Sequence, residues 1–448
     1  MAVETRYALS REAHIAYQVL SDGELDLLFV PSFMSNIELS LGHSAIGSFM
    51  ERLARFTRLI QFDRRGNGMS DGAGSASTLE EQLDDVSAVL DGVGSRETAM
   101  IAVNEGAALA LLYAATYPER VRALVLMTPQ ARLVSGPGYE WALSAEQRSA
   151  AVQVVVEQWG RDSTENPWLV FGGQRPDQRA AMARYQRLAM GPGDAAAALA
   201  LAGETDVRDV LGSIQCPTLV LRRQGDPFID ERHCRYVAEQ VPGAHYVQLS
   251  GDGQIWIGDR EEAAREIEDF LTGVRPPLPS ERVLATVLFT DIVGSTELAG
   301  ELGDTGWREL LEQHDALLNA EVRAHRGRVV KSLGDGALAL FDGPTRALGC
   351  AVALGKLMHG LGVSIRAGLH TGECELLADE DVGGIAVHIA ARISALAGPD
   401  EVLASSTVRD LSVGSPFRLE SRGEQRFKGV ADPWLVFAVA AESPSRQT

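Results

Sequence analysis

Two aspartates, Asp291 and Asp335, each stand after an apolar segment and beside a turn that contains glycine. The first lies in Leu288–Thr296, LFTDIVGST, and the second in Val330–Gly336, VKSLGDG. Two carboxylates at neighbouring strand ends suit Mg²⁺, which prefers hard oxygen ligands and takes few of them from protein. The small residues after Asp291 leave backbone N–H groups open to a polyphosphate. The pattern therefore indicates a nucleotide triphosphate bound together with divalent metal ions.

Strands must position these aspartates. The apolar strand Val283–Thr290 leads into Asp291, and a hairpin of Arg328–Lys331 and Gly336–Phe341 holds Asp335 in its turn. A long stretch with apolar residues at helical spacing separates the strand from the hairpin. We therefore expect both carboxylates at one edge of a sheet that a helix covers.

In this order and spacing, the motifs of residues 283–441 resemble a class III nucleotide cyclase domain, an α+β fold of the ferredoxin-like kind. The resemblance implies two Mg²⁺ or Mn²⁺ ions per active site, held by Asp291, Asp335 and the backbone of Ile292. It assigns adenine recognition to Lys331 and Asp381. The other implied site residues are the transition-state arginine Arg392, the ribose-orienting position His388, and the triphosphate-binding residues Gly294, Ser295, Thr296, Arg366 and Lys428.

The chemistry of Lys331 and Asp381 favours ATP over GTP. Lysine donates and aspartate accepts, whereas adenine offers the N1 acceptor and the N6 amino donor. Guanine presents the reverse and would leave both protein groups mispaired in a desolvated pocket. Arg392 would stabilise charge on the α-phosphate during in-line attack by the ribose 3′-hydroxyl. We expect an adenylate cyclase that forms 3′,5′-cyclic AMP and pyrophosphate by two-metal-ion catalysis.

His388 departs from the family pattern, in which most members carry an asparagine that orients the ribose. Histidine can still donate a hydrogen bond, but it titrates near neutral pH. We therefore expect retained activity with an altered pH dependence. In this family the active site lies between two domains, and this chain holds one cyclase domain with both halves of the residue set. The resemblance thus implies a head-to-tail homodimer with two equivalent sites.

The first part of the chain alternates short apolar strands with helices, which indicates a mostly parallel, doubly wound sheet. It resembles the α/β-hydrolase fold in FDRRGNGMSD (62–71), AVNEGAALALLYAATYPERV (102–121) and CPTLVLRRQGD (216–226). Together the two parts resemble bacterial hydrolase–cyclase fusions of the actinobacterial type. We expect a hydrolase-like domain at 1–273 with a helical lid at about 129–206, a Pro-rich linker at 274–282, the cyclase domain at 283–441 and a tail at 442–448.

The hydrolase-like domain has lost its catalytic triad. The fold's G-x-S-x-G elbow reads AVNEG here, so Asn104 occupies the nucleophile position. Asp226 keeps the acid position, and Gln254 replaces the histidine expected after the last strand. Because an amide cannot serve as the nucleophile and no base accompanies it, we expect no triad chemistry. Two roles are open for the domain: it senses a small, apolar molecule, or it serves only folding or dimerisation.

Composition restricts the other possibilities. The 448 residues carry a formal net charge of −20, which argues against a general nucleic-acid or anionic-membrane binder. The four cysteines form no CxxC pair, and the chain shows neither an apolar run that could span a bilayer nor the apolar core of a signal peptide. We expect a cytoplasmic protein.

Two alternatives to the cyclase remain open. An esterase with a cyclase-like appendage would hydrolyse esters. Asn104 and Gln254, which replace the nucleophile and the base of the triad, argue against this alternative. A catalytically silent nucleotide-binding regulator, inactivated by His388, would bind ATP without forming cyclic AMP. Guanylate cyclase activity is a lesser alternative, opposed by Lys331 and Asp381.

Overall fold

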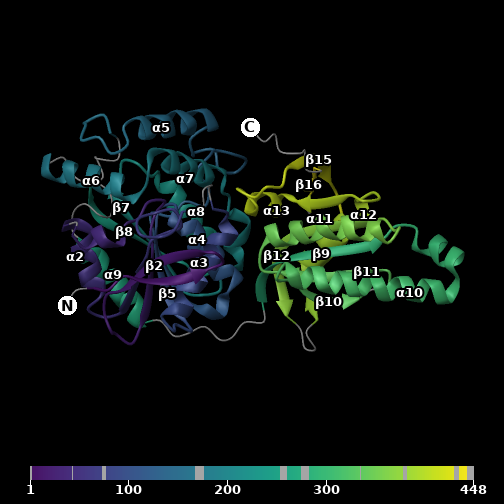
Figure 1. Cartoon of the computed structure of the whole chain (residues 1–448). Coiled ribbons are helices and arrows are strands. Elements are labelled where there is room, and N and C mark those ends of the chain that lie inside the picture. Colours follow the sequence, from purple (N-terminus) through teal and green to yellow (C-terminus); the bar gives the residue numbers. More distant parts are fainter. Residues whose placement is uncertain are drawn as a thin grey trace. The chain divides into compact units, whose positions relative to one another are not determined.

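The chain divides into two compact units, Met1–Ser280 and Glu281–Thr448, in a computed structural model (Figure 1). Each unit contains its own eight-stranded sheet. The structure describes residues 3–42, 44–72, 77–166, 176–252, 260–273, 282–332, 334–376, 381–427 and 433–440.

The N-terminal unit is built on a sheet with the strand order β1-β2-β4-β3-β5-β6-β7-β8. Strands β3 to β8 run parallel, and the β1–β2 hairpin adds antiparallel strands at one edge. The strands are β1 (Arg6–Ser10), β2 (Ala13–Val19), β3 (Asp26–Val30), β4 (Arg58–Phe62), β5 (Thr98–Val103), β6 (Val121–Met127), β7 (Thr218–Gly225) and β8 (His245–Asp252). Every residue of β5 is buried, as expected for a central parallel strand covered on both faces.

Helices cover both faces of this sheet. They are α1 (Ile37–Ser40), α2 (Ser44–Leu53), α3 (Leu79–Gly92), α4 (Gly106–Thr116), α5 (Ala145–Glu157), α6 (Pro176–Ala189), α7 (Pro192–Glu204), α8 (Glu231–Gln240) and α9 (Arg260–Gly273). A capping box between Thr78 and Glu81 starts α3, because each side chain accepts a hydrogen bond from the other residue's backbone N–H. Helices α5, α6 and α7 fall within the predicted lid segment and lie together at one end of the unit (Figure 1).

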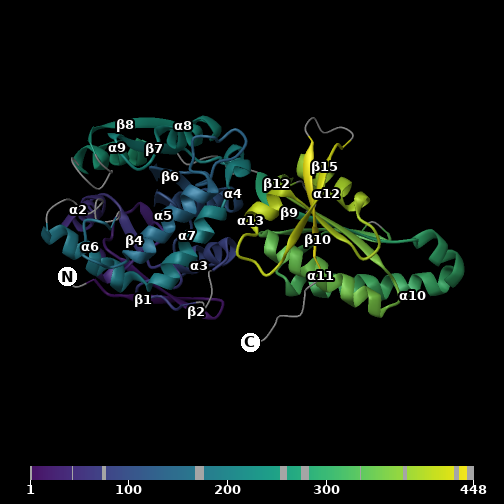
Figure 2. The same ribbon diagram turned by 90° about the horizontal axis from the view of Figure 1, so that it is seen from above.

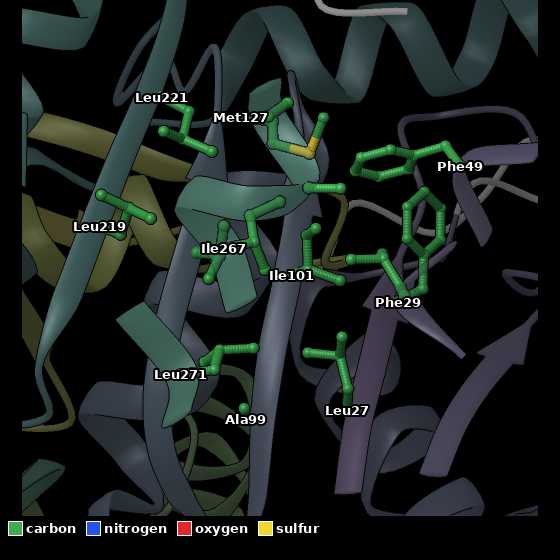
Figure 3. Packing of buried hydrophobic residues seen from close by; sticks show 14 of the residues in the cluster. Leu27, Phe29, Phe49, Ala99, Ile101, Met127, Leu219, Leu221, Ile267 and Leu271 are labelled. Carbon is green, nitrogen blue, oxygen red and sulfur yellow. The ribbon is translucent and has the colours of Figure 1, made fainter. Parts of the chain in front are cut away.

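One apolar core joins helices α2 and α9 to the sheet. Figure 3 shows Leu27, Ile101, Leu219 and other strand residues facing Phe49 of α2 and Ile267 of α9. These side chains are at most 2% exposed. Full burial of each large apolar side chain contributes roughly 1.5–3 kcal/mol to the stability of the folded state. This core therefore holds in place the strands of the sheet, including β5, which leads into the elbow at Asn104.

The C-terminal unit has the strand order β10-β11-β9-β12-β14-β16-β15, with β13 paired to β12. The strands are β9 (Arg282–Ile292), β10 (Arg328–Ser332), β11 (Gly336–Phe341), β12 (Ile365–Leu376), β13 (Val382–Gly383), β14 (Val402–Ser405), β15 (Leu419–Gln425) and β16 (Trp434–Val439). The helices are α10 (Ser295–Ala324), α11 (Pro344–Gly360), α12 (Ile385–Leu396) and α13 (Ser406–Leu411).

The two faces of this sheet carry different helices. Leu288 and Ile292 of β9 pack in one cluster with residues of α10 and α11, whereas Val287 of β9 packs in another with Ala386 and Ala390 of α12. Figure 2 shows α10 and α11 on one side of the sheet and α12 on the other. Because side chains alternate between faces along a strand, Asp291 falls on the α12 face, the same face as Val287.

Candidate active site

Asp291 and Asp335 lie side by side at one end of the second sheet. Asp291 is the penultimate residue of β9, and it stands opposite Gly336 of β11. The backbone N–H of Ile292 donates to the carbonyl oxygen of Asp335 over 2.9 Å. The turn of the β10–β11 hairpin therefore places the second aspartate next to the first, and Ile292 is at the same strand end.

The close approach of these strands explains the glycine after Asp335. A Cβ atom at Gly336 would lie 2.3 Å from the carbonyl oxygen of Thr290 and 3.3 Å from Oδ1 of Asp291. The first contact is too short for any real side chain, so a substituted residue would push β11 away from β9 and separate the two aspartates.

Arg366 balances the charge of one aspartate. It stands opposite Asp291 on β12, and its Nε donates to Asp291 Oδ2 over 3.0 Å, with a second contact from Nη2. The Asp335 carboxylate, in contrast, has no hydrogen-bonding or ionic partner within the part of the chain that the structure describes. The Asp291 carboxylate is therefore paired with Arg366, whereas the Asp335 carboxylate is open to a ligand.

This donor set fits a divalent metal ion that binds together with phosphate. Among the described residues, no group of three or more His, Cys, Asp or Glu side chains gathers at any point. Mg²⁺ is usually held by one or two carboxylates plus the phosphates of a substrate, rather than by a larger protein cage. Two adjacent carboxylates, with backbone oxygen at Ile292 within the same turn, meet that requirement.

The segment after Asp291 forms the start of helix α10. Val293 donates its N–H to Ser364 O over 2.9 Å, Gly294 adopts the left-handed conformation (φ 69°), and Ser295 is the first helical residue. Thr296 follows on the exposed surface. The first N–H groups of a helix have no partner within the helix, so this end can bind an anion beside the aspartates.

Lys331 and Asp381 contact each other although 50 residues separate them in the sequence. Lys331 Nζ donates to Asp381 Oδ2 over 3.0 Å, and the Val382 N–H donates to Asp381 Oδ1 over 2.8 Å. The backbone N–H first, and the lysine second, lower the pKa of the Asp381 carboxyl group. The two side chains remain 53% and 40% exposed, so the donor and the acceptor are available to a ligand.

His388 and Arg392 lie one turn apart on the exposed face of α12. The opposite face, with Ile389 and Ile393, is buried against the sheet. Neither His388 nor Arg392 makes a hydrogen bond or an ion pair to any described residue. Lys428 lies outside the described residues.

The predicted residues thus form three groups in the chain. Asp291, Asp335 and Arg366 are together at one strand end, Lys331 is paired with Asp381, and His388 is on the same helix face as Arg392. Within the described residues, no hydrogen bond or ion pair joins one group to another. The sequence did not reveal the pairing of Arg366 with Asp291, since register between distant strands has no local signal.

The elbow of the N-terminal unit keeps its shape without a nucleophile. Asn104 follows β5 with a φ of 48°, a strained conformation that Asn tolerates better than most residues. Its Oδ1 accepts a hydrogen bond from Thr128 Oγ1 over 2.8 Å. A Cβ atom at Gly106 would lie 2.4 Å from Pro31 O, so the helix after the elbow must start with glycine.

Asp226 occupies the predicted acid position and is 8% exposed. Its Oδ1 accepts from the N–H groups of Phe228 and Ile229 over 2.9 and 3.2 Å, while Oδ2 has no partner in the described structure. Burial raises the pKa of this carboxyl group. Gln254, predicted at the position of the base, lies outside the described residues.

Comparison with known families agrees with both architectures. Residues 27–257 match the family described as alpha/beta hydrolase fold, and residues 279–440 match the adenylate and guanylate cyclase catalytic domain. The chain belongs to the α/β-hydrolase fold family through its first unit, and its second unit is a cyclase catalytic domain. These matches confirm the predicted fold class and both resemblances.

Individual relatives each cover one part of the chain. Putative adenylate cyclase 3 of Rhizobium meliloti is 32% identical over 175 residues, which are 37% of this chain and 30% of that protein. The poly(3-hydroxyalkanoate) depolymerase of Ectopseudomonas oleovorans is 28% identical over 246 residues, 54% of this chain and 82% of that protein. Among solved structures, an esterase from Exiguobacterium antarcticum (16% identity, TM-score 0.54) covers 60% of this chain and 100% of its own, and it shows the fold alone.

In the ranges that the structure describes, no helix is both long enough and apolar enough to cross a bilayer.

Proposed function

We propose that the chain is an adenylate cyclase that converts ATP to 3′,5′-cyclic AMP and pyrophosphate. The observation that carries the proposal is the adjacency of Asp291 and Asp335, whose strand ends are joined by the 2.9 Å backbone hydrogen bond from Ile292 N–H to Asp335 O. These two carboxylates and the Ile292 backbone would hold the divalent ions, which lower the pKa of the ribose 3′-hydroxyl and neutralise phosphate charge when bound.

The other groups of the site bind and orient the nucleotide. Lys331 donates to adenine N1, and Asp381 accepts from the N6 amino group, so their present ion pair opens to admit the base between them. The start of α10 and Arg366 bind the triphosphate, with Lys428 as a further cation, and the guanidinium of Arg392 stabilises charge on the α-phosphate. His388 donates a hydrogen bond that orients the ribose.

Two copies of the chain complete each site. Arg392 and His388 lie on an exposed face of α12 with no partner among the described residues, and the family precedent places them across an interface from the metal-binding aspartates. Exposed Ile385 and Leu396, 53% and 46% accessible, extend this helix face with apolar surface. A head-to-tail dimer would cover them and would bring two complete residue sets together.

We infer that the N-terminal unit is a regulatory, ligand-sensing module and has no hydrolytic activity. The elbow position holds the amide of Asn104, which is already hydrogen-bonded to Thr128. Neither the Asn104 amide nor the Thr128 hydroxyl can act as an activated nucleophile there, which supports this inference.

The test of the proposed activity is a product assay. Purified chain is incubated with ATP or GTP and with Mg²⁺ or Mn²⁺, and cyclic nucleotides and pyrophosphate are quantified by chromatography. We expect cyclic AMP from the wild type and none above background from Asp291→Ala. ATP binding without any product would show a silent regulator, and an active Asp291→Ala variant would contradict the assigned metal site.

A further inference from the structure

The N-terminal unit contains a cavity of about 370 Å³ next to the elbow. Its walls include Arg64 after β4, Glu105 and Leu109 at the start of α4, and Ala198 and Leu201 of α7. Neither Asn104 nor Asp226 is among the described residues that line it. If each water-sized volume of about 30 Å³ holds one heavy atom, the cavity admits a molecule on the order of ten heavy atoms.

Two of the five charged residues that line the cavity are neutralised within the protein. Arg65 Nη2 lies 2.5 Å from Asp85 Oδ1, and both side chains are buried. Arg132 Nη1 lies 3.1 Å from Asp206 Oδ2. Asp194, at the start of α7, is exposed to solvent, whereas Arg64 and Glu105 are half-buried and need a separate explanation.

Arg64 carries a positive charge that forms no ion pair with any described residue. Its Nη1 donates to Ser32 O over 3.2 Å and its Nη2 donates to Gln82 Oε1, so these contacts use two of the five N–H donors of a guanidinium. Across the described residues, no carboxylate lies within ion-pairing distance of it. Burial lowers the pKa of Arg64 to about 10, so the group is still charged at neutral pH. A guanidinium in this state favours a carboxylate ligand, which can accept two parallel hydrogen bonds.

Glu105 presents the opposite charge in the same cavity. Its Oε2 accepts from Ser32 Oγ over 2.6 Å, and its Oε1 has no partner in the described parts of the chain. Glu105 attracts Arg64 electrostatically, but the two groups do not form an ion pair. A ligand with only a carboxylate would place a second negative charge beside Glu105, which is unfavourable in a buried site.

We propose that this cavity binds a small zwitterion with an apolar body, namely an amino acid with an aliphatic or aromatic side chain. The carboxylate pairs with Arg64, and the ammonium group pairs with Glu105. The side chain packs against apolar wall residues such as Phe33, Leu79 and Leu109. The proposal deepens the sensing role inferred for the N-terminal unit, and it concerns binding alone.

Isothermal titration calorimetry on the full chain, without nucleotide or metal, tests this assignment separately from cyclase activity. The probes are leucine, phenylalanine and methionine, together with 4-methylpentanoate and 3-methylbutylamine, which each lack one charged group of leucine. We expect at least one amino acid to bind, and each analogue of leucine to bind about ten- to a hundredfold more weakly than leucine, as expected for one lost charge-assisted contact. Equal binding of leucine and 4-methylpentanoate, or no binding by any amino acid, would overturn the proposal.

Two variants assign the contacts. Arg64→Gln should weaken leucine far more than 3-methylbutylamine, and Glu105→Gln, which keeps an acceptor for Ser32, should weaken leucine far more than 4-methylpentanoate. Arg58→Gln is the matched control, since Arg58 pairs with Asp26 at the start of β4, away from the cavity. If Arg64→Gln does not fold, Glu105→Gln and the analogue series still decide the question. Leucine binding that is equally weakened in all three variants would contradict the assigned contacts.

Discussion

Reversing the donor and the acceptor of the Lys331–Asp381 pair should change the base that the site accepts. In Lys331→Glu/Asp381→Asn, the glutamate accepts from guanine N1–H and the asparagine amide donates to guanine O6. Asp381 Oδ1 already accepts from its neighbour Val382, whereas Oδ2 contacts Lys331. Asparagine can therefore keep the backbone contact with its oxygen and present its NH₂ group where Oδ2 now lies.

The size of the effect follows from the exposure of the pair and from hydrogen-bond energies. With side chains 53% and 40% exposed, the ion pair is screened by solvent and adds little to folding, so the variant should fold. Each mispaired base contact costs roughly 1–3 kcal/mol, and two cost roughly 2–6 kcal/mol. The ratio of kcat/KM for ATP to that for GTP should fall by at least about 30-fold from the loss of the ATP contacts alone, and further because GTP gains matched contacts.

The assay measures kcat/KM for both nucleotides by chromatography of the cyclic products, with Lys331→Met as a control that removes the donor without supplying an acceptor. The control should lose ATP turnover and gain little with GTP. If the double variant keeps the wild-type preference, or if a folded double variant loses both activities in equal proportion, the pair does not select the base.

Three further predictions concern single residues. Burial raises the pKa of Asp63 from 3.8 to about 6, so the stability that its neutral form contributes is fully present below about pH 4 and is lost as the pH rises through 6. The stability of the wild type relative to Asp63→Asn, measured by chemical unfolding, should therefore fall by roughly 3 kcal/mol over that range. A difference in stability that stays constant with pH would contradict this prediction. Asn104→Ala loses the Thr128 contact and also strains the left-handed backbone, whereas Asn104→Gly loses the contact alone. Chemical unfolding should show the alanine variant to be less stable than the glycine variant by roughly 1 kcal/mol. The reverse order of stability would refute the backbone argument. His388→Asn should retain cyclase activity, because asparagine can donate the same hydrogen bond to the ribose, and a folded but inactive variant would remove the role given to His388.

Much of the fold follows from local patterns. The parallel strands were predicted because buried strands form continuous apolar runs, and the predicted segment Arg58–Phe62 coincides with β4. The spacing of Leu79, Leu83, Val86 and Leu90 predicts helix α3, whose buried face contains all four. In contrast, the antiparallel hairpin of β1 and β2 was not predicted, since its strands mix exposed polar and buried apolar residues and include a charged N-terminal segment.

The sequence predicts which residues belong to the candidate site, but it does not predict how they are arranged. Lys331 and Asp381 were grouped through family resemblance, and their contact depends on the registers of β10 and β13 with their neighbouring strands, which no local pattern encodes. The contact of Arg366 with Asp291 arises in the same way, from their opposition on β12 and β9. The cavity residues Arg64 and Glu105 lie within the segments that indicate the hydrolase fold. They can be recognised as candidate ligand-binding groups only once the structure shows that the neighbouring charges are paired with each other.

The most direct measurement mixes two inactive variants of the full chain. Asp291→Ala removes a metal-binding residue and Arg392→Ala removes the transition-state arginine, so each variant alone should form no cyclic AMP. If each site combines the aspartates of one copy with Arg392 of the other, half of the mixed dimers are heterodimers with one intact site of two, and the mixture should recover about one quarter of the wild-type rate. A mixture of Asp291→Ala with Asp335→Ala should stay inactive, since both sites of every dimer then lack a metal-binding residue. No recovery in the first mixture, despite confirmed heterodimers, would contradict a shared two-chain cyclase site.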